Sequence, residues 1–195
     1  MMFKIIIMGG GGHTLSCIDV IQSQSKFSFA GVVLKDKNDT TTYNFNILGY
    51  ENDLKKLRKK YKYALIGIGR VRGSKTRYRL YNSLKKNKFI LPIIKSKFSH
   101  VSPNAKISEG TIIMHGAIIN SKAKIGKNCI INNGSIIDHG ATIGSHTHIT
   151  TGVIINGDAK IGEQNYIGSG TVVHQGIKIN DKNIIPSLSR ITKTI

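Results

Sequence analysis

The sequence has no tryptophan and few cysteine, proline or acidic residues. Its two cysteines, Cys17 and Cys129, exclude a disulfide-rich scaffold and are typical of a protein from a reducing compartment. There is no CxxC motif and no Cys/His cluster with metal-ligand spacing, so we expect no metal site. The longest early apolar run, residues 3–8, is too short for a membrane span or a secretion signal. We therefore expect a cytoplasmic protein without a membrane span.

Basic residues outnumber acidic ones by 29 to 10, which gives a net charge of +19. The excess lies mainly in residues 1–100, which hold 20 basic and 5 acidic residues. Such a surface attracts nucleic acid, or smaller phosphate-bearing ligands such as nucleotide-linked sugars and coenzymes. The chain lacks an RNA-recognition motif, zinc-finger spacing and interleaved aromatic residues. We therefore favour the smaller ligands and expect no nucleic-acid partner.

A six-residue repeat dominates the C-terminal half. Every sixth residue from Val101 to Ile191 is isoleucine or valine, at sixteen successive positions. The next residue is often Gly, Asn or Asp, which suits a turn, and the β-branched residue suits an inward-facing strand position. Three repeats close one coil of eighteen residues, so residues 101–185 predict a parallel β-helix of four to five coils.

The N-terminal half predicts a small α/β domain. Four apolar runs are typical of buried strands, one segment has the apolar spacing of a helix, and two further segments are interpreted as basic helices. The strands are expected at 3–8, 29–34, 63–68 and 89–94, and the helices at 14–24, 51–60 and 74–87. Their alternation predicts a parallel sheet with right-handed crossovers. We expect a Rossmann-like domain over residues 1–98 and a β-helix domain over residues 99–195.

The first expected strand ends in four glycines and His13, directly before the first expected helix. Glycines let backbone N–H groups approach an anion, and a helix N-terminus favours negative charge. The dinucleotide fingerprint is incomplete, because Thr14 stands where its third glycine would be. The loop therefore predicts a phosphate cradle, and a tight turn without a ligand is the alternative.

These features occur together with an Ile-Gly-Ile-Gly segment at residues 66–69. From residue 3 to about residue 182 the combination resembles the hexapeptide-repeat sugar acetyltransferases. That family includes sialic-acid O-acetyltransferases, bacillosamine-pathway UDP-4-amino-sugar N-acetyltransferases and GDP-perosamine N-acetyltransferases. The resemblance implies a left-handed β-helix, a homotrimer with active sites between neighbouring chains, acetyl-CoA as co-substrate and no metal.

The resemblance places the catalytic base at His139, and acyl transfer to an amine needs a base of near-neutral pKa. The family often has a carboxylate directly after this histidine, where this chain has Gly140. Asp138 is the candidate replacement, but adjacent strand residues face opposite sides, so its direction stays open. Gly157 lies eighteen residues after His139 and leaves space beside the imidazole, where we expect the reacting thioester.

The resemblance also assigns ligand contacts. Coenzyme contacts fall on Asn132, His148, Gly157 and Ser169, with the Gly157 N–H as an oxyanion donor. Substrate contacts fall on Gly11, Gly12, His13, Asp36 and Gly69. Arg70 and Arg77 suit either a phosphate or a solvated basic helix. The tail has Pro186-Ser where the family often has Gly-x-Pro-Ala, so it receives no coenzyme contact.

The resemblance therefore predicts N-acetyl transfer from acetyl-CoA to a nucleotide-linked amino sugar, in the synthesis of a surface glycan. His139 takes the amine proton while the nitrogen attacks the thioester, without a covalent enzyme intermediate. One alternative is O-acetylation of a sialic-acid-type sugar, which the missing carboxylate at Gly140 disfavours. The other is a non-catalytic β-helix that binds a nucleotide-sugar or organises a complex.

Overall fold

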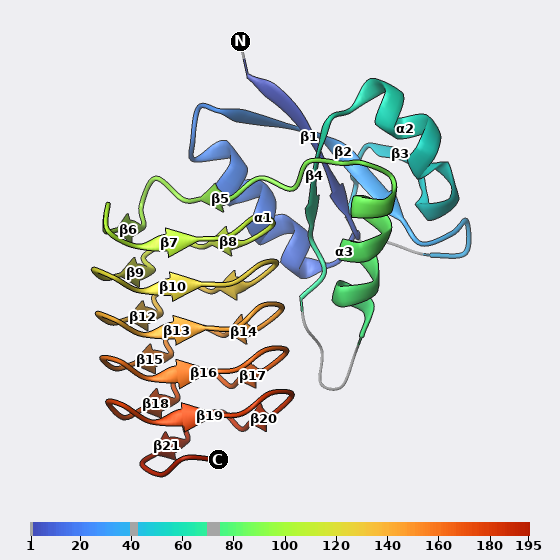
Figure 1. The fold of residues 1–195 in the computed structure, drawn as a ribbon. Helices are drawn as coiled ribbons and strands as arrows, with labels where there is room; N and C mark the ends of the chain where they lie inside the picture. The colour runs from blue at the N-terminus through green and yellow to red at the C-terminus, as the bar shows by residue number, and fades with distance from the viewer. Residues whose placement is uncertain (1, 40–42, 70–74) are drawn as a thin grey trace. The chain divides into compact units, whose positions relative to one another are not determined.

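The computed structural model describes residues 2–39, 43–69 and 75–195, which divide into two compact units near residue 92. The first unit is an α/β domain, and the second is a parallel β-helix (Figure 1). Each unit has its own cluster of buried apolar side chains.

The first unit is a four-stranded parallel sheet with helices between its strands. Its elements are β1 (Phe3–Met8), α1 (Gly12–Gln22), β2 (Phe27–Leu34), β3 (Ile47–Tyr50), η1 (Glu51–Asp53), α2 (Leu54–Lys60), β4 (Tyr63–Ile66) and α3 (Thr76–Lys86). The strand order is β3-β2-β1-β4, so β1 lies inside the sheet with neighbours on both sides. This arrangement confirms the predicted Rossmann-like class.

The central strand explains the core of this unit. Residues 5–8 of β1 are all buried, as an inner strand covered on both faces requires. Ile6 and Met8 belong to one apolar cluster with Ile66 of β4 and Leu80 and Leu84 of α3. Their shared burial holds α3 on the sheet.

Two features of this unit differ from the sequence-based expectation. The pattern does not predict β3, a short edge strand whose residues are exposed or half-buried. The strand expected at residues 89–94 is wrong, because there a single bridge, from Ile90 to Tyr63, joins the sheet. Phe89 and Leu91 are buried in the core, and Pro92 has no N–H to donate to a ladder. The apolar side chains in residues 89–94 therefore serve the packing of the core and do not mark a strand.

The second unit stacks two-residue strands into three parallel sheets (Figure 1). One sheet contains β5 (Ile94–Lys95), β8 (Ile112–Ile113), β11 (Ile130–Ile131), β14 (His148–Ile149), β17 (Tyr166–Ile167) and β20 (Ile184–Ile185). The next contains β6 (His100–Val101), β9 (Ile118–Ile119), β12 (Ile136–Ile137), β15 (Ile154–Ile155), β18 (Val172–Val173) and β21 (Arg190–Ile191). The last contains β7 (Lys106–Ile107), β10 (Lys124–Ile125), β13 (Thr142–Ile143), β16 (Lys160–Ile161) and β19 (Lys178–Ile179).

The register of these sheets repeats every eighteen residues, as in the pairing of Ile125 with Ile143. From β6 onward the second residue of each strand points inward, and those from Ile113 to Ile185 form one buried column. This confirms the predicted fold class, a left-handed parallel β-helix that follows an α/β domain. The stack begins at β5, before the expected start at residue 101, because exposed Lys95 breaks the Ile/Val pattern there. It continues past residue 185 to β21.

The outward residues give two of the three sheets a distinct character. On the β6–β21 sheet, four successive outward residues are apolar and are stacked in register: Ile118, Ile136, Ile154 and Val172. We call the side of the prism that they form the apolar face. On the β7–β19 sheet, four of the five outward residues are lysine: Lys106, Lys124, Thr142, Lys160 and Lys178. We call the side of the prism that they form the lysine face. One side of the prism is therefore cationic, while another exposes β-branched apolar side chains.

Truncation of an inward isoleucine tests the account of the core. Ile143 is buried in the column, so Ile143→Ala removes packed methyl groups and leaves a cavity. We expect it to lower the free energy of unfolding by about 2–5 kcal/mol in urea denaturation. Lys160→Ala, a change at an exposed outward position, should cost less than about 0.5 kcal/mol. Equal effects of the two substitutions would contradict the inward assignment.

Candidate functional site

Three sequence-predicted segments of the α/β unit lie at the carboxyl edge of its sheet. The glycine-rich loop follows β1, Asp36 follows β2 and Gly69 follows β4, and these three strands are adjacent and parallel. From β1 the chain crosses through α1 to β2, whereas β4 lies on the opposite side of β1. Sheets of this type bind ligands at such a switch point, in the crevice between diverging connections.

The loop between β1 and α1 leaves the start of the helix accessible. The Gly9 N–H donates to the Val33 carbonyl at 2.9 Å, and the Thr14 N–H donates to the Gly11 carbonyl at 2.9 Å. A Cβ on Gly11, the residue before the helix, would meet no atom within 4 Å. Gly11 and Gly12 are exposed, so their backbone can approach a ligand at the helix N-terminus.

His13 lies beside Gly69 at this edge. A Cβ built on Gly69 would lie 3.8 Å from both Cβ and Cγ of His13, which is ordinary van der Waals contact. Burial, together with the positive charge of the nearby Arg77 guanidinium, lowers the pKa of His13 to about 4. The imidazole is therefore neutral at pH 7, with one donor and one acceptor nitrogen.

Arg77 of α3 is buried, with 4% of its surface exposed. Its Nη1 donates to the carbonyls of Ile66 and Ile68, at 2.7 and 3.1 Å. These hydrogen bonds connect α3 to the segment that leads to Gly69. Arg77 therefore stabilises the position of this segment at the edge of the sheet. The sequence left two roles open for Arg77, binding a phosphate or lying on a solvated basic helix. Because Arg77 is buried, it is not a solvated residue of such a helix. Arg70 lies outside the described residues.

Asp36 lies in a turn after β2. Its Oδ1 accepts the Asn38 N–H at 2.9 Å, and the Lys35 Nζ lies 3.9 Å from its Oδ2. The carboxylate is thus positioned by its own turn, at the same edge of the sheet as the glycine-rich loop.

His139 lies in the turn between β12 and β13, on the edge where the apolar and lysine faces meet. The Asp138 Oδ1 lies 3.1 Å from the His139 Nδ1 and accepts the Asn120 Nδ2–H at 2.8 Å. Hydrogen bonds from the Asn120 amide and from the His139 backbone N–H lower the pKa of Asp138. An ionised carboxylate only accepts, so the pair requires the hydrogen on Nδ1 and leaves the Nε2 lone pair for a substrate. The direction of Asp138, which the sequence left open, is therefore toward the His139 ring.

Gly157 makes room for the imidazole of His139. A Cβ at residue 157 would lie 2.6 Å from both Cε1 and Nε2 of that ring. The ring itself occupies the space beside Gly157, where the sequence suggested room for a thioester. There is no room for both a side chain at residue 157 and the His139 ring. The imidazole can therefore take this position because residue 157 is glycine.

Of the residues expected to contact coenzyme, Gly157 lies beside His139, and the other three lie elsewhere on the prism. His148 is the outward residue of β14, 7% exposed, and its ring meets Tyr166 edge-on at 5.4 Å. The Asn132 N–H donates to the Ile149 carbonyl at 2.9 Å, and the Ser169 Oγ donates to the Thr150 Oγ1 at 3.3 Å. Asn132 and Ser169 lie in turns between the β5–β20 sheet and the apolar face. The apolar face therefore separates these residues from His139 and Gly157.

Sequence reasoning missed the part played by Asn120. It stands eighteen residues before Asp138, so the coil period places the two side chains in neighbouring turns.

Cys129 is buried in the coil and donates its Sγ–H to the Gly144 carbonyl at 3.2 Å. Over 2–39, 43–69 and 75–195 there is no group of three His, Cys, Asp or Glu residues arranged to hold a metal ion. No helix in these ranges is long and apolar enough to span a membrane.

Comparisons with known proteins agree with this architecture. Residues 4–84 match the PglD N-terminal domain, and residues 98–139 match the bacterial transferase hexapeptide family of six repeats. No curated protein matches significantly. Each unit therefore matches a family model of its own, the α/β unit the PglD N-terminal domain and the β-helix the bacterial transferase hexapeptide repeats.

Solved structures share the fold over both units. The acetyltransferase domain of PglB from Neisseria gonorrhoeae has 21% identity and a TM-score of 0.87, covering 98% of this chain and 92% of that one. Its complex with acetyl coenzyme A gives a TM-score of 0.85 at 21% identity, with 98% and 93% coverage. PerB from Caulobacter crescentus, in complex with CoA and GDP-perosamine, gives 0.66 at 21% identity, also with 98% and 93% coverage.

The lowered pKa of His13 predicts how stability depends on pH. The folded value, about 4, lies below the ordinary value of 6.5, so the unfolded chain takes up the proton first. Stability should therefore fall as the pH drops from about 6.5 towards 4, by up to about 3 kcal/mol, and His13→Gln should remove this part of the loss. NMR titration of the His13 Cε1–H checks the cause directly. A midpoint near 6.5 would contradict the burial argument.

Proposed function

We propose that this protein transfers an acetyl group from acetyl-CoA to the amino group of a nucleotide-linked sugar. The observation that carries the proposal is the hydrogen-bonded array of Asn120, Asp138 and His139, seated over Gly157. The array supplies an oriented imidazole on an edge of the β-helix. Related folds support the choice of ligands, since one was solved with acetyl coenzyme A and another with CoA and GDP-perosamine.

In the proposed reaction the sugar nitrogen attacks the thioester carbonyl directly. The His139 Nε2 takes a proton from the nitrogen, while the Asp138 carboxylate holds the Nδ1–H and stabilises the imidazolium that forms. The C–N bond forms, the C–S bond breaks, and coenzyme A leaves as a thiolate that recovers the proton. Within the described ranges the Gly157 N–H has no protein acceptor, so it can donate to the developing oxyanion. Cys129 is buried and takes no part as an acyl carrier.

The α/β unit would hold the nucleotide. Its glycine-rich loop and the N-terminus of α1 suit phosphate oxygens, and Asp36 at the end of β2 suits a ribose hydroxyl or a base. Neutral His13 beside Gly69 offers hydrogen bonds without a charge, which suits the uncharged hydroxyls of a sugar. Arg77 keeps the Gly69 side of this crevice in place.

We further propose that the active enzyme is a homotrimer in which the apolar face is covered by neighbouring chains. Ile118 is 37% exposed, and its stacked partners Ile136, Ile154 and Val172 extend the apolar surface along the prism. One edge of this face carries His139, and the other carries Asn132 and Ser169, with His148 on the adjoining sheet. A site that uses both sets therefore needs the edges of two chains.

O-acetylation of a sialic-acid-type sugar is a second candidate. A hydroxyl is a poorer nucleophile than an amine and needs a well-oriented base. From the sequence, the absence of a carboxylate at Gly140 therefore disfavours O-acetylation. The contact between Asp138 and the His139 Nδ1 provides that orientation, so it favours neither acceptor. A non-catalytic scaffold does not explain why a polar array fixes an imidazole over a glycine.

Release of free thiol from acetyl-CoA tests the proposed function. The purified protein is assayed against nucleotide-linked 3-amino and 4-amino sugars and against sialic-acid-type acceptors, with His139→Ala in parallel. We expect turnover with an amino sugar and a loss of about 10²–10⁴-fold in kcat for the variant. Turnover with hydroxyl acceptors alone would replace the N-acetyl assignment, and unchanged turnover in His139→Ala would remove the base. Absence of turnover with every acceptor would contradict the enzyme proposal.

Asp138 is expected to act by positioning the base. Asp138→Asn keeps the size of the side chain but lets its amide donate, so the His139 tautomer is no longer specified. We expect kcat to fall by about 10–100-fold while the KM for each substrate stays within about twofold. Asp181→Asn is the matched control, because Asp181 bonds the Glu163 N–H on another edge of the prism. A rise in KM with unchanged kcat would instead indicate a binding role for Asp138.

A further inference from the structure

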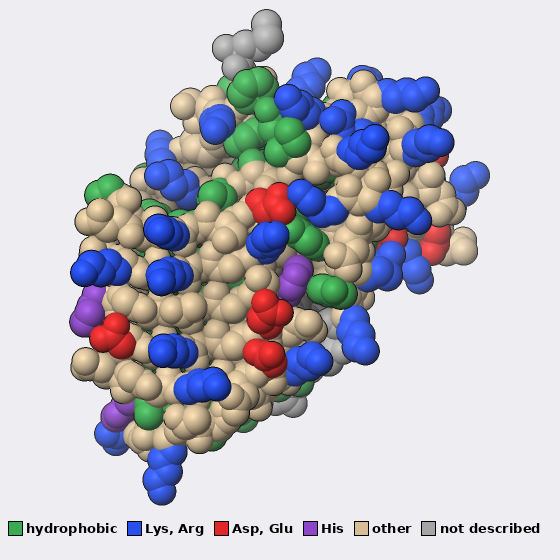
Figure 2. Space-filling model, in the orientation of Figure 1, with side chains coloured by type: hydrophobic (Ala, Val, Ile, Leu, Met, Phe, Trp, Pro, Cys, Tyr) green, Lys and Arg blue, Asp and Glu red, His purple; other side chains and the backbone are tan. Residues whose placement is uncertain are grey.

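The lysines of the β-helix are concentrated on one of its three sides. Residues 101–195 hold nine basic residues. Five of them lie on the lysine face or in the turn that enters it: Lys106, Lys122, Lys124, Lys160 and Lys178. Figure 2 shows the same concentration as basic side chains running down the side formed by the β7–β19 sheet. More than half of the basic residues in residues 101–195 therefore lie on or beside one side of the prism.

The register stacks like charges without local compensation. Lys106 pairs with Lys124, and Lys160 pairs with Lys178, in directly hydrogen-bonded strands. Like charges opposite one another destabilise a sheet, so the arrangement favours an anion between them. In the part of the chain that the structure describes, no carboxylate lies within 4 Å of these ammonium groups.

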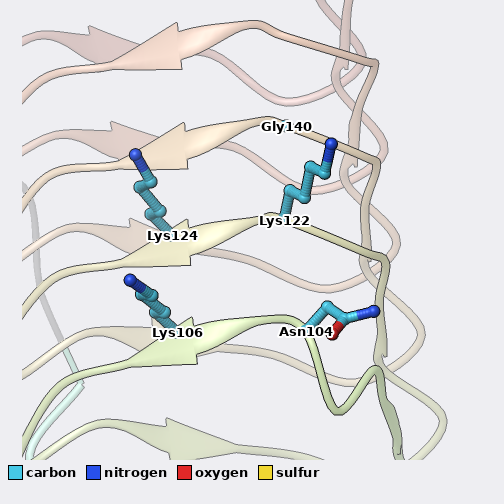
Figure 3. A pocket seen from close by; sticks show the side chains of 5 residues that line it. All are labelled: Asn104, Lys106, Lys122, Lys124 and Gly140. Carbon is cyan, nitrogen blue, oxygen red and sulfur yellow. The ribbon is translucent and has the colours of Figure 1, made fainter.

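A hollow of about 320 Å³ lies at one end of the lysine face. It is lined by Asn104, Lys106, Lys122, Lys124 and Gly140 (Figure 3). Lys122 and Lys124 come from one coil, Lys106 and Asn104 from the coil before, and Gly140 from the coil after. Gly140 directly follows His139, so the hollow adjoins the turn that carries the proposed base.

We propose that this hollow is a phosphate-binding subsite, in which the Lys106, Lys122 and Lys124 ammonium groups hold the phosphate or diphosphate of a nucleotide-type ligand. Lysine binds phosphate as a compact charge, and three lysines around one hollow match the two to four charges of such a group. The Asn104 side chain adds an amide at the rim.

This subsite extends the proposed function and rests on it for its biological ligand. Both proposed substrates carry diphosphates, and coenzyme A also carries a 3′-phosphate. A subsite one residue from His139 would anchor the charged part of one of them while its reactive group reaches the Nε2. Anchoring of a non-reacting part is a common source of orientation at the reacting centre.

The test compares two variants with equal loss of charge. K106Q/K122Q/K124Q removes the lysines around the hollow, whereas K160Q/K178Q/K182Q removes three from later coils on or beside the same face. Binding of pyrophosphate, UDP, coenzyme A and dephospho-coenzyme A is measured by calorimetry at 0.15 M salt. Circular dichroism checks that both variants are folded. Pyrophosphate binding does not require acetyl transfer, so it reports on the subsite even if the proposed reaction fails.

We expect the K106Q/K122Q/K124Q variant to lose about tenfold in affinity for pyrophosphate, since each exposed charge pair changes affinity a few-fold. The later-coil variant should stay within about twofold. A matching loss for UDP assigns the subsite to the nucleotide-sugar, in place of the glycine-rich loop as the site of its diphosphate. A loss for coenzyme A that is absent with dephospho-coenzyme A assigns it to the 3′-phosphate. Equal losses in both variants, or unchanged pyrophosphate binding in the first, would overturn the proposal.

Discussion

Parallel pairing between residues eighteen positions apart is the constraint on which the rest of this structure depends. It places an inward isoleucine beneath another in coil after coil, which produces the buried column. The same register sets Asn120 against Asp138 and the His139 ring over Gly157. It also aligns Lys106 with Lys124 beside the hollow. One repeat length therefore determines the core, the polar array and the cationic side together.

The triangular cross-section separates functions among edges and faces. The proposed base and Gly157 lie on one edge of the apolar face, and Asn132, His148 and Ser169 lie at or beyond the other edge. A single prism cannot bring these edges together, because the apolar face lies between them. Packing of apolar faces between chains would bury Ile118 and its neighbours and bring edges of different chains close. In this account the drive to bury apolar surface is what assembles the site.

Most of the fold follows from patterns that the sequence displays. The Ile/Val repeat predicts the β-helix because each inward position is occupied by the same kind of residue, and it fails at Lys95 because a terminal strand is less enclosed. The strand expected over 89–94 fails because buried helix-flanking residues and buried strands have the same composition. In the site, the family resemblance points to His139, and the spacing of eighteen residues from it points to Gly157. The direction of Asp138, the buried state of Arg77 and the support from Asn120 depend on side-chain packing, which no single-sequence pattern records.

A crystal structure of the protein with coenzyme A and a nucleotide-linked amino sugar tests the central claim most directly. We expect the sugar nitrogen and the coenzyme sulfur to meet at the His139 Nε2 of one chain. We also expect Asn132, His148 and Ser169 of a neighbouring chain to contact the coenzyme. A coenzyme bound wholly within one chain, or a sugar amine remote from His139, would contradict it.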